Sequence, residues 1–118
     1  MKKDKHLNIL SNLNMHMKFN EKVYKLTKQI PKGKVSTYGM IAKALNTKAY
    51  RAVGSALHVN PYSPIVPCHR IVKSSGELGG FAGGINKKIK MLEIEGIKIK
   101  NGKVVDFKKF LFKNFKKL

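Results

Sequence analysis

One short segment carries the side chains best suited to covalent chemistry. It reads Pro67-Cys68-His69-Arg70, lies in an otherwise apolar stretch and holds the single cysteine of the 118-residue chain. A free thiol has a pKa of about 8.5 and becomes a useful nucleophile beside a base or a positive charge. His69 and Arg70 are candidates for these two partners. The other interpretation, an inert cysteine packed in the core, is equally compatible with a lone thiol.

Glu95 is the acid best placed to assist His69. It comes three and four residues after two apolar positions of the helix predicted over residues 86–95, so it lies toward that helix's apolar side. A carboxylate there needs a hydrogen-bonding partner, and His69 is a sensible one. A solvated glutamate at a helix end is the alternative. Neighbours on an extended chain point to opposite faces, so proton transfer between Cys68 and His69 requires a bend or a bridging water.

The net charge of the chain indicates which class of molecule it is expected to bind. Twenty-five basic residues against six acidic ones give +19. Such a surface attracts polyanions, of which nucleic acid is the commonest inside a cell. Because 23 of the basic residues are lysines and the chain is rich in Asn and Ile, a nucleotide bias in the gene is a second explanation. Small ribosomal proteins have similar charge, so the charge predicts nucleic-acid binding and no particular activity.

The composition also excludes several classes of protein. A single cysteine rules out a disulfide scaffold and a cysteine-rich zinc site. No run of about 18 apolar residues is present, and the amino terminus lacks the apolar core of a secretory signal. We therefore expect a soluble, cytoplasmic protein, associated with the nucleoid in a prokaryote, with no membrane partner, no metal and no cofactor.

Apolar spacing predicts one mostly helical α+β domain. Residues 1–18 show no sustained period, and we expect them to form a flexible or loosely docked leader to a domain over residues 19–118. Apolar residues at helical spacing predict a first helix over residues 19–30. Asn20 is a possible cap for it.

Two short helices and a tight turn predict a helix-turn-helix. The first is capped by Ser36 or Thr37, and the second runs over residues 48–59. Around Arg51 the second helix carries mostly small residues: Ala49, Ala52, Gly54, Ser55 and Ala56. Helices that read the major groove usually present long polar side chains. These small residues therefore either approach a narrow surface, with Arg51 as the one long probe, or pack against a neighbouring helix.

The remaining segments are shorter. Three prolines between residues 61 and 67 predict an extended stretch that leads through the cysteine to residue 72. The glycine-rich loop 79–84 lacks the Lys-Ser/Thr ending of a phosphate-binding loop, so its backbone is expected to approach a flat group such as a base. Alternation over residues 97–107 around Asn101-Gly102 predicts a small hairpin, and a short amphipathic helix is expected in the tail.

Taken in order, these residues resemble the active-site domain of O6-alkylguanine-DNA alkyltransferases over roughly residues 19–112. The matching positions are Tyr38, Arg51-Ala52-Val53-Gly54, Asn60-Pro61, Pro67-Cys68-His69-Arg70 and Glu95-Gly96. The resemblance implies a winged-helix-like α+β domain whose helix-turn-helix enters the minor groove. It also implies a monomer that acts on double-stranded DNA containing alkylated guanine and removes the alkyl group from O6.

The resemblance implies a role for each matched side chain. Cys68 would be the nucleophile, His69 its base through a water, and Glu95 the group that orients His69; Asn60 would hold the cysteine segment against the helix-turn-helix. The implied DNA-binding residues are Tyr38, Gly39, Asn46, Arg51, Ala52, Gly54 and Ser74. The implied substrate-pocket residues are Tyr38, Ile71, Phe81, Ala82 and Gly83. Arg51 would fill the space of the extruded base while Tyr38 helps to rotate the nucleotide out.

Three departures from the family pattern affect what is expected. Members usually carry an amino-terminal α/β domain, and only 18 residues precede Phe19 here, so we expect lower stability more than lost activity. Phe81 and Ala82 stand where some members have Tyr and Ser, which removes a side-chain hydroxyl from the pocket. The alkyltransferase-like lesion-binding proteins carry Trp at the cysteine position. Cys68 argues against that class, and a non-catalytic lesion sensor that recruits other repair factors is the second hypothesis.

Overall fold

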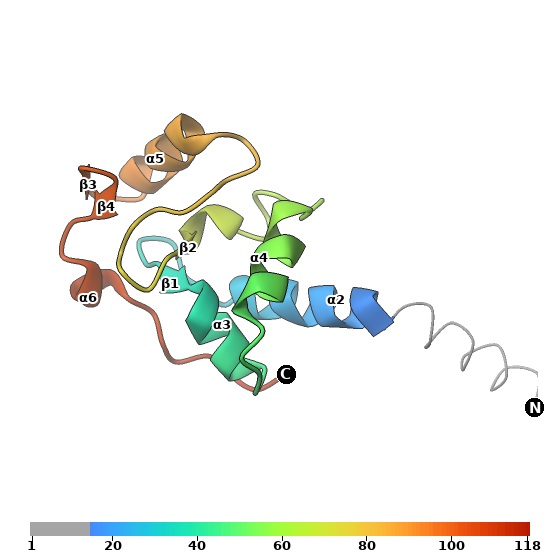
Figure 1. Ribbon diagram of the computed structural model, residues 1–118. Helices are drawn as coiled ribbons and strands as arrows, with labels where there is room; N and C mark the ends of the chain where they lie inside the picture. Colours follow the sequence, from blue (N-terminus) through green and yellow to red (C-terminus); the bar gives the residue numbers. More distant parts are fainter. Residues whose placement is uncertain (1–14) are drawn as a thin grey trace, which may run out of the picture.

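The structure is a computed structural model that describes residues 15–118, so most of the predicted leader lies outside the described residues (Figure 1). Helices dominate, with two small two-stranded sheets. In chain order the elements are α2 (Met15–Thr27), β1 (Ser36–Thr37), α3 (Tyr38–Ala44), α4 (Tyr50–His58), a 3-10 turn (Cys68–Arg70), β2 (Ile71–Val72), α5 (Ile85–Ile94), β3 (Ile99–Lys100), β4 (Lys103–Val104) and α6 (Phe107–Phe110). The predicted α+β class is confirmed.

Helix α2 differs from its prediction at the amino-terminal end. It begins at Met15, so Asn20 lies inside the helix and is not its cap. The predicted apolar face is confirmed, because Val23 and Leu26 are almost completely buried. The hydroxyl of Tyr24 donates a hydrogen bond of 2.7 Å to the carbonyl of Ala56, which fixes α2 against α4.

Helices α3 and α4 form the predicted helix-turn-helix (Figure 1). Thr37 caps α3, since its side-chain oxygen accepts a hydrogen bond of 3.0 Å from the amide of Met40. Asn46 turns the chain with a φ of 58°, a left-handed conformation that asparagine tolerates. Helix α4 begins at Tyr50, two residues later than expected.

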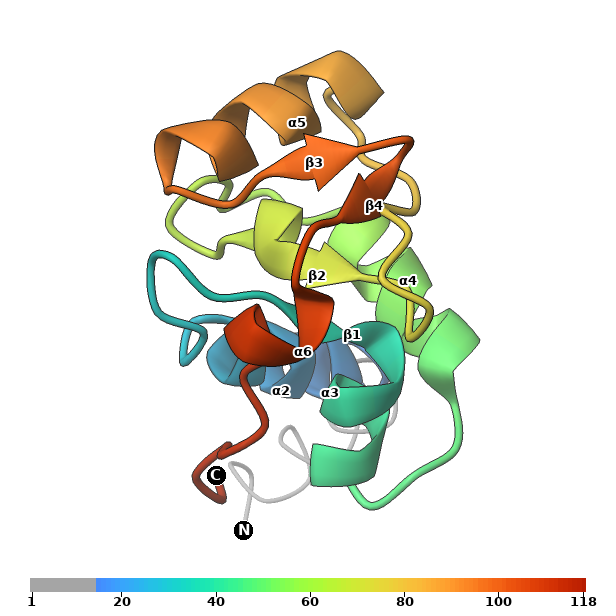
Figure 2. The ribbon, with the colours of Figure 1, turned by 90° about the vertical axis from the view of Figure 1, so that its left-hand side faces the viewer.

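Two apolar clusters form the core, and the short sheet β1–β2 lies between them. The first cluster joins α2, α3 and α4, and the second joins α5 to the hairpin β3–β4. Strands β1 and β2 pair in parallel, with Ser36 opposite Ile71 and Thr37 opposite Val72. Figure 2 shows α5 and the hairpin on one side of this sheet and α2 and α3 on the other. The sheet therefore holds the helix-turn-helix next to the segment that follows the cysteine.

Of the predictions for the connecting segments, one was wrong, the short helix in the tail is confirmed only over one turn, and the hairpin is confirmed. Residues 61–66 form consecutive turns instead of an extended stretch, and the chain then enters the 3-10 turn. The tail contains only the single turn α6 and continues as an irregular segment, with the amide of Phe112 donating a 2.7 Å hydrogen bond to the carbonyl of Val35. The hairpin is present, and Asn101 and Gly102 both have positive φ, as a tight hairpin turn requires. Within residues 15–118, no helix has the length and apolar character needed to cross a membrane.

Candidate active site

Cys68 opens onto a small cavity. It is the first residue of the 3-10 turn and is partly exposed, so it is not an enclosed core thiol. The cavity has a volume of about 100 Å³. Its lining comes from four segments of the chain: Tyr38, Gly54, Leu57, His58, Cys68, Gly80, Phe81 and Ala82. Tyr38, Phe81 and Ala82, which the family resemblance placed in a substrate pocket, therefore meet at the thiol.

His69 lies on the inner side of the same turn. It is only 2% exposed, and its Nε2 lies 2.9 Å from Oε2 of Glu95. The predicted pairing of these two side chains is confirmed. The 3-10 turn is the bend after Cys68 that a straight strand would lack.

Arg70 also binds Glu95, which the sequence did not indicate. Its Nε donates to Oε1 at 2.9 Å and its Nη2 to Oε2 at 2.7 Å, in the two-bond geometry typical of arginine and a carboxylate. Its Nη1 donates to the carbonyl of Ile30 at 2.9 Å. Arg70 was expected to provide charge beside Cys68; instead it joins the end of α5 to the chain just after α2.

These contacts fix the tautomer of His69. Burial alone would raise the pKa of Glu95, but hydrogen bonds from Arg70 and His69 outweigh it and lower that pKa. An ionised carboxylate only accepts hydrogen bonds, so Nε2 of His69 carries the proton and donates. Burial lowers the pKa of His69 below 6.5, although the hydrogen bond to Glu95 opposes this effect. His69 is therefore neutral at pH 7, with a lone pair on Nδ1.

The Nδ1 atom is the ring nitrogen available to take a proton. It is buried and has no hydrogen-bond partner among residues 15–118. A buried polar atom of this kind needs a partner, and one is expected in the working state. His69 can thus serve as a general base whose orientation Glu95 controls.

Lys88 supports the wall of the cavity and was missed by sequence reasoning. Its side chain is completely buried, and Nζ donates to the carbonyls of Ile71, Leu78 and Gly80 at 2.7, 2.5 and 3.2 Å. Burial lowers the pKa of Lys88 to about 8, although the charge of Cys68 opposes this shift. A signal was present, because Lys88 comes four residues before the buried Leu92 and so lies on the apolar face of α5.

Tyr38 lines the same cavity as the Cys68 thiol and lies beside two glycines, Gly54 and Gly79. A Cβ on Gly79, whose φ is +71°, would come 3.1 Å from the Tyr38 hydroxyl oxygen. A Cβ on Gly54 would make only ordinary contact with the Tyr38 ring, at 3.8 Å. Gly54 itself lines the cavity, so its lack of a side chain chiefly leaves space in the cavity. Burial raises the pKa of Tyr38, and the nearby Cys68 raises it further. Its hydroxyl therefore keeps its proton at neutral pH.

The comparison with known families decides the classification. Residues 18–97 match the sequence model of the 6-O-methylguanine DNA methyltransferase DNA-binding domain. The chain belongs to this family. The matched residues include the helix-turn-helix, all the residues that line the cavity, and helix α5.

Three relatives illustrate the relationship. A methylated-DNA–protein-cysteine methyltransferase from Thermococcus kodakarensis is 53% identical over 81 residues, which are 68% of this chain and 45% of that protein. Mycobacterium tuberculosis OGT, solved in complex with DNA, has 46% identity and a TM-score of 0.64, and the match covers 65% of this chain and 48% of that one. S. pombe Atl1, solved with damaged DNA containing O6-carboxymethylguanine, has 34% identity and a TM-score of 0.72 over 82% of this chain and 96% of that chain. The chain spans about half the length of the curated methyltransferases it matches.

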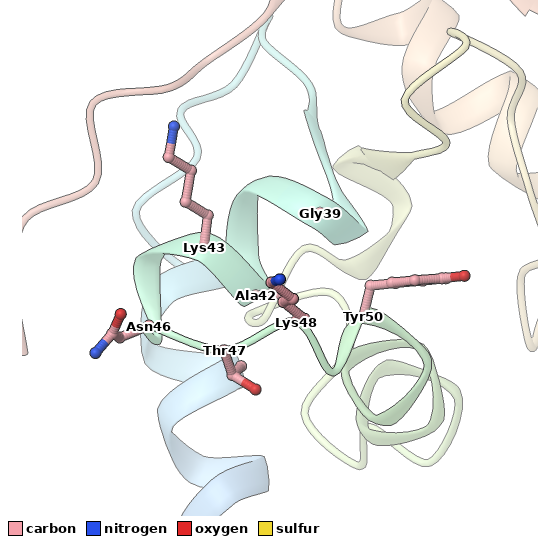
Figure 3. Close-up of a pocket in the computed structure, with 7 residues that line it drawn as sticks. All are labelled: Gly39, Ala42, Lys43, Asn46, Thr47, Lys48 and Tyr50. Atoms are coloured by element: carbon pink, nitrogen blue, oxygen red, sulfur yellow. The ribbon is translucent and has the colours of Figure 1, made fainter.

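Most of the predicted DNA-binding residues line two open hollows beside the cavity. Gly39 and Asn46 belong to a hollow of about 620 Å³ at the turn between α3 and α4 (Figure 3). Gly39 also lines a second hollow of about 440 Å³, together with Tyr38 and Ser74. Arg51 is exposed on α4 and Ala52 is half-buried beside it. Neither of these two residues lines either of these hollows or the Cys68 cavity.

Three of the other predicted site residues do not touch the cavity. Ile71 is completely buried in the first core cluster. Gly83 lies beside the Phe81 ring, where an added Cβ would come within 2.9 Å of it, but Gly83 does not line the cavity. Asn60 holds the turns before the cysteine, since its Nδ2 donates to the carbonyl of Val66 at 3.0 Å and its Oδ1 accepts from the amide of Tyr62 at 2.9 Å. Asn60 was predicted among the catalytic residues, but this geometry suits a positioning residue. No group of three metal-ligating side chains occurs in the described part of the chain.

Proposed function

We propose that this protein repairs DNA by transferring an alkyl group from O6 of guanine to Cys68 in a single, irreversible turnover. The observation that carries the proposal is the arrangement of Cys68. It opens onto a cavity that Tyr38 also lines, and His69, which is paired with Glu95, follows it in the same 3-10 turn. An inert structural cysteine needs neither the cavity nor the base.

The chemistry is a direct displacement at the alkyl carbon. A water relays the proton of Sγ to Nδ1 of His69, and the imidazolium is stabilised by Glu95. Sγ then forms a bond to the alkyl carbon while the bond from that carbon to O6 breaks and its electron pair stays with guanine. The hydroxyl of Tyr38 donates a hydrogen bond to the departing base. The product thioether holds the alkyl group permanently, so each molecule acts once.

The substrate is a guanine that has left the helix. The O6 substituent is stacked inside a duplex, so the nucleotide must rotate out, at a cost of a few kcal/mol that is lower for a damaged pair. The small side chains of α4 suit close contact with a minor groove, and Arg51 is the exposed long side chain that would occupy the vacated space. We propose a monomer acting on double-stranded DNA, near the nucleoid in a prokaryote.

A lesion sensor is the second candidate function. The match to S. pombe Atl1, of which the chain covers 96%, favours it. A sensor would bind alkylated duplex tightly, leave the alkyl group in place and recruit other repair factors. Cys68 in the cavity favours the transferase.

Intact-mass measurement separates the two functions. After incubation with a duplex containing O6-methylguanine, a transferase gains the mass of one CH2 group, and Cys68→Ala abolishes the gain. Tight binding of the lesion by the wild type with no change in mass would support the sensor.

A further inference from the structure

Tyr50 is an exposed aromatic residue that the proposed chemistry does not use. It is the first residue of α4 and its side chain is 53% exposed. By contrast, the similarly exposed Tyr62 packs edge-on against Tyr24 with 5.8 Å between ring centres. Within residues 15–118, the Tyr50 side chain makes no hydrogen bond or aromatic contact.

Tyr50 stands between two basic hollows. Together with Gly39 it lines both the hollow at the α3–α4 turn and the one beside Tyr38. The first hollow also contains Ala42, Lys43, Asn46, Thr47 and Lys48, and the second Tyr38, Lys73, Ser74 and Ser75. Figure 3 shows the Tyr50 side chain directed away from Lys43 and Asn46. Because Tyr50 lines both hollows, it lies at the boundary between them.

Each hollow combines a mostly apolar lining with lysine and hydroxyl side chains that can contact phosphate. Lys43 and Lys48 provide two ammonium groups on one side of Tyr50, and Lys73 provides one on the other. No carboxylate lines either hollow among the described residues, although Glu77 accepts a hydrogen bond of 3.0 Å from the Ser75 hydroxyl at the edge of the second. Lysines and hydroxyls are the groups that proteins use to contact DNA phosphates.

A strand of DNA presents the same order of chemistry, with a charged phosphate, an apolar sugar and another phosphate. We propose that the Tyr50 ring packs against a deoxyribose of the damaged strand while the flanking phosphates occupy the two hollows. This inference rests on the proposed binding of duplex DNA. Tyr38 lines both the second hollow and the Cys68 cavity, so the two adjoin each other. A strand bound at Tyr50 therefore passes the entrance of the cavity.

Binding to an unmodified duplex tests the proposal without any alkyl transfer. Loss of the ring's contact surface should weaken binding by Tyr50→Ala by at least about fivefold, the lower end of what loss of an aromatic stack on a base costs. Tyr50→Phe keeps the ring and should bind as tightly as the wild type. Tyr62→Ala, which removes a similarly exposed tyrosine in the turns after α4, is the matched control and should also bind normally. Thermal melting checks that each variant is folded.

Salt dependence distinguishes a ring contact from a phosphate contact. Loss of an apolar contact leaves the slope of log affinity against log salt unchanged, whereas Lys48→Ala should reduce that slope by about one phosphate contact. Normal binding by Tyr50→Ala, a loss with Tyr50→Phe as large as with Tyr50→Ala, or a loss with Tyr62→Ala of the same size would overturn the inference. A wild type that binds no duplex would overturn it together with the proposed function. Tyr50-dependent binding without methyl transfer would contradict the proposed function alone.

Discussion

At the scale of single residues, the decisive feature is that one carboxylate accepts hydrogen bonds from two basic side chains, the charged Arg70 and the neutral His69. Glu95 accepts both a two-bond contact from Arg70 and the Nε2 proton of His69. Arg70 keeps the carboxylate ionised and fixed, and the fixed carboxylate holds His69 in the tautomer whose Nδ1 can accept a proton. Arg70 therefore influences the Cys68 thiol indirectly, through Glu95 and then His69.

Glu95→Gln should slow methyl transfer to Cys68 by about a hundredfold, the size of effect expected when a positioned base is impaired. An amide keeps the shape of the side chain but removes the charge that stabilises the His69 imidazolium. A single-turnover rate measured by intact mass gives the value. Glu93→Gln, at an exposed position on the same helix, is the control. Equal rates for Glu95→Gln and the wild type would eliminate Glu95 from the proton relay.

At the scale of secondary-structure elements, Lys88 connects helix α5, strand β2 and the loop that follows β2. Its ammonium on α5 binds the carbonyl of Ile71 in β2 and the carbonyls of Leu78 and Gly80 in the loop that walls the cavity. Burial of the ammonium group carries a desolvation cost, which is why the pKa of Lys88 falls to about 8.

Lys88→Met should remove a pH dependence of stability. The lysine loses its proton near pH 8 when folded but near 10.5 when unfolded, so the unfolded chain binds more protons between these values. The folded wild type therefore gains stability relative to Lys88→Met as pH rises from 8 to 10.5. Thermal melts at several pH values measure the difference. Lys90→Met, an exposed position on α5, should show no such trend, and a flat difference for Lys88→Met would contradict the assigned cost of burial.

In the proposed function, helix α4 opens the duplex so that the damaged base can leave it. Arg51→Ala should slow methyl transfer from duplex DNA by about tenfold or more, because an unfilled gap favours return of the base into the stack. Reaction with a free O6-alkylguanine base needs no extrusion and should keep its rate. Paired single-turnover measurements on the two substrates make the comparison, and equal losses on both would rule out a role in extrusion.

Sequence periodicity predicted some of these elements and not others. The helix-turn-helix, the Thr37 cap and the Asn101-Gly102 hairpin depend on local signals, and all three are present. The turns over residues 61–66 were not foreseen, because three prolines restrict each residue without determining the path of the chain. Two site contacts were likewise missed, those of Arg70 and Lys88. Both bind groups that are distant in sequence, so only the packed chain brings them together.

At the scale of the whole molecule, charge and covalent chemistry are separated. The lysines give the chain its +19 charge and supply a sequence-independent attraction to phosphate. One of the two arginines, Arg51, is exposed on α4, and the other, Arg70, is partly buried against Glu95. The two core clusters meet at β1–β2, so the helix-turn-helix packs on one side of this sheet, and α5 with the hairpin packs on the other.

The stoichiometry and position of the transferred group test the central claim most directly. The protein is titrated with an excess of duplex containing O6-methylguanine, and its peptides are then mapped by mass spectrometry. The account predicts that the gain stops at one methyl group per molecule and that this group lies on the peptide containing Cys68. Methylation at another residue, continued turnover, or tight binding with no methyl gained would contradict it.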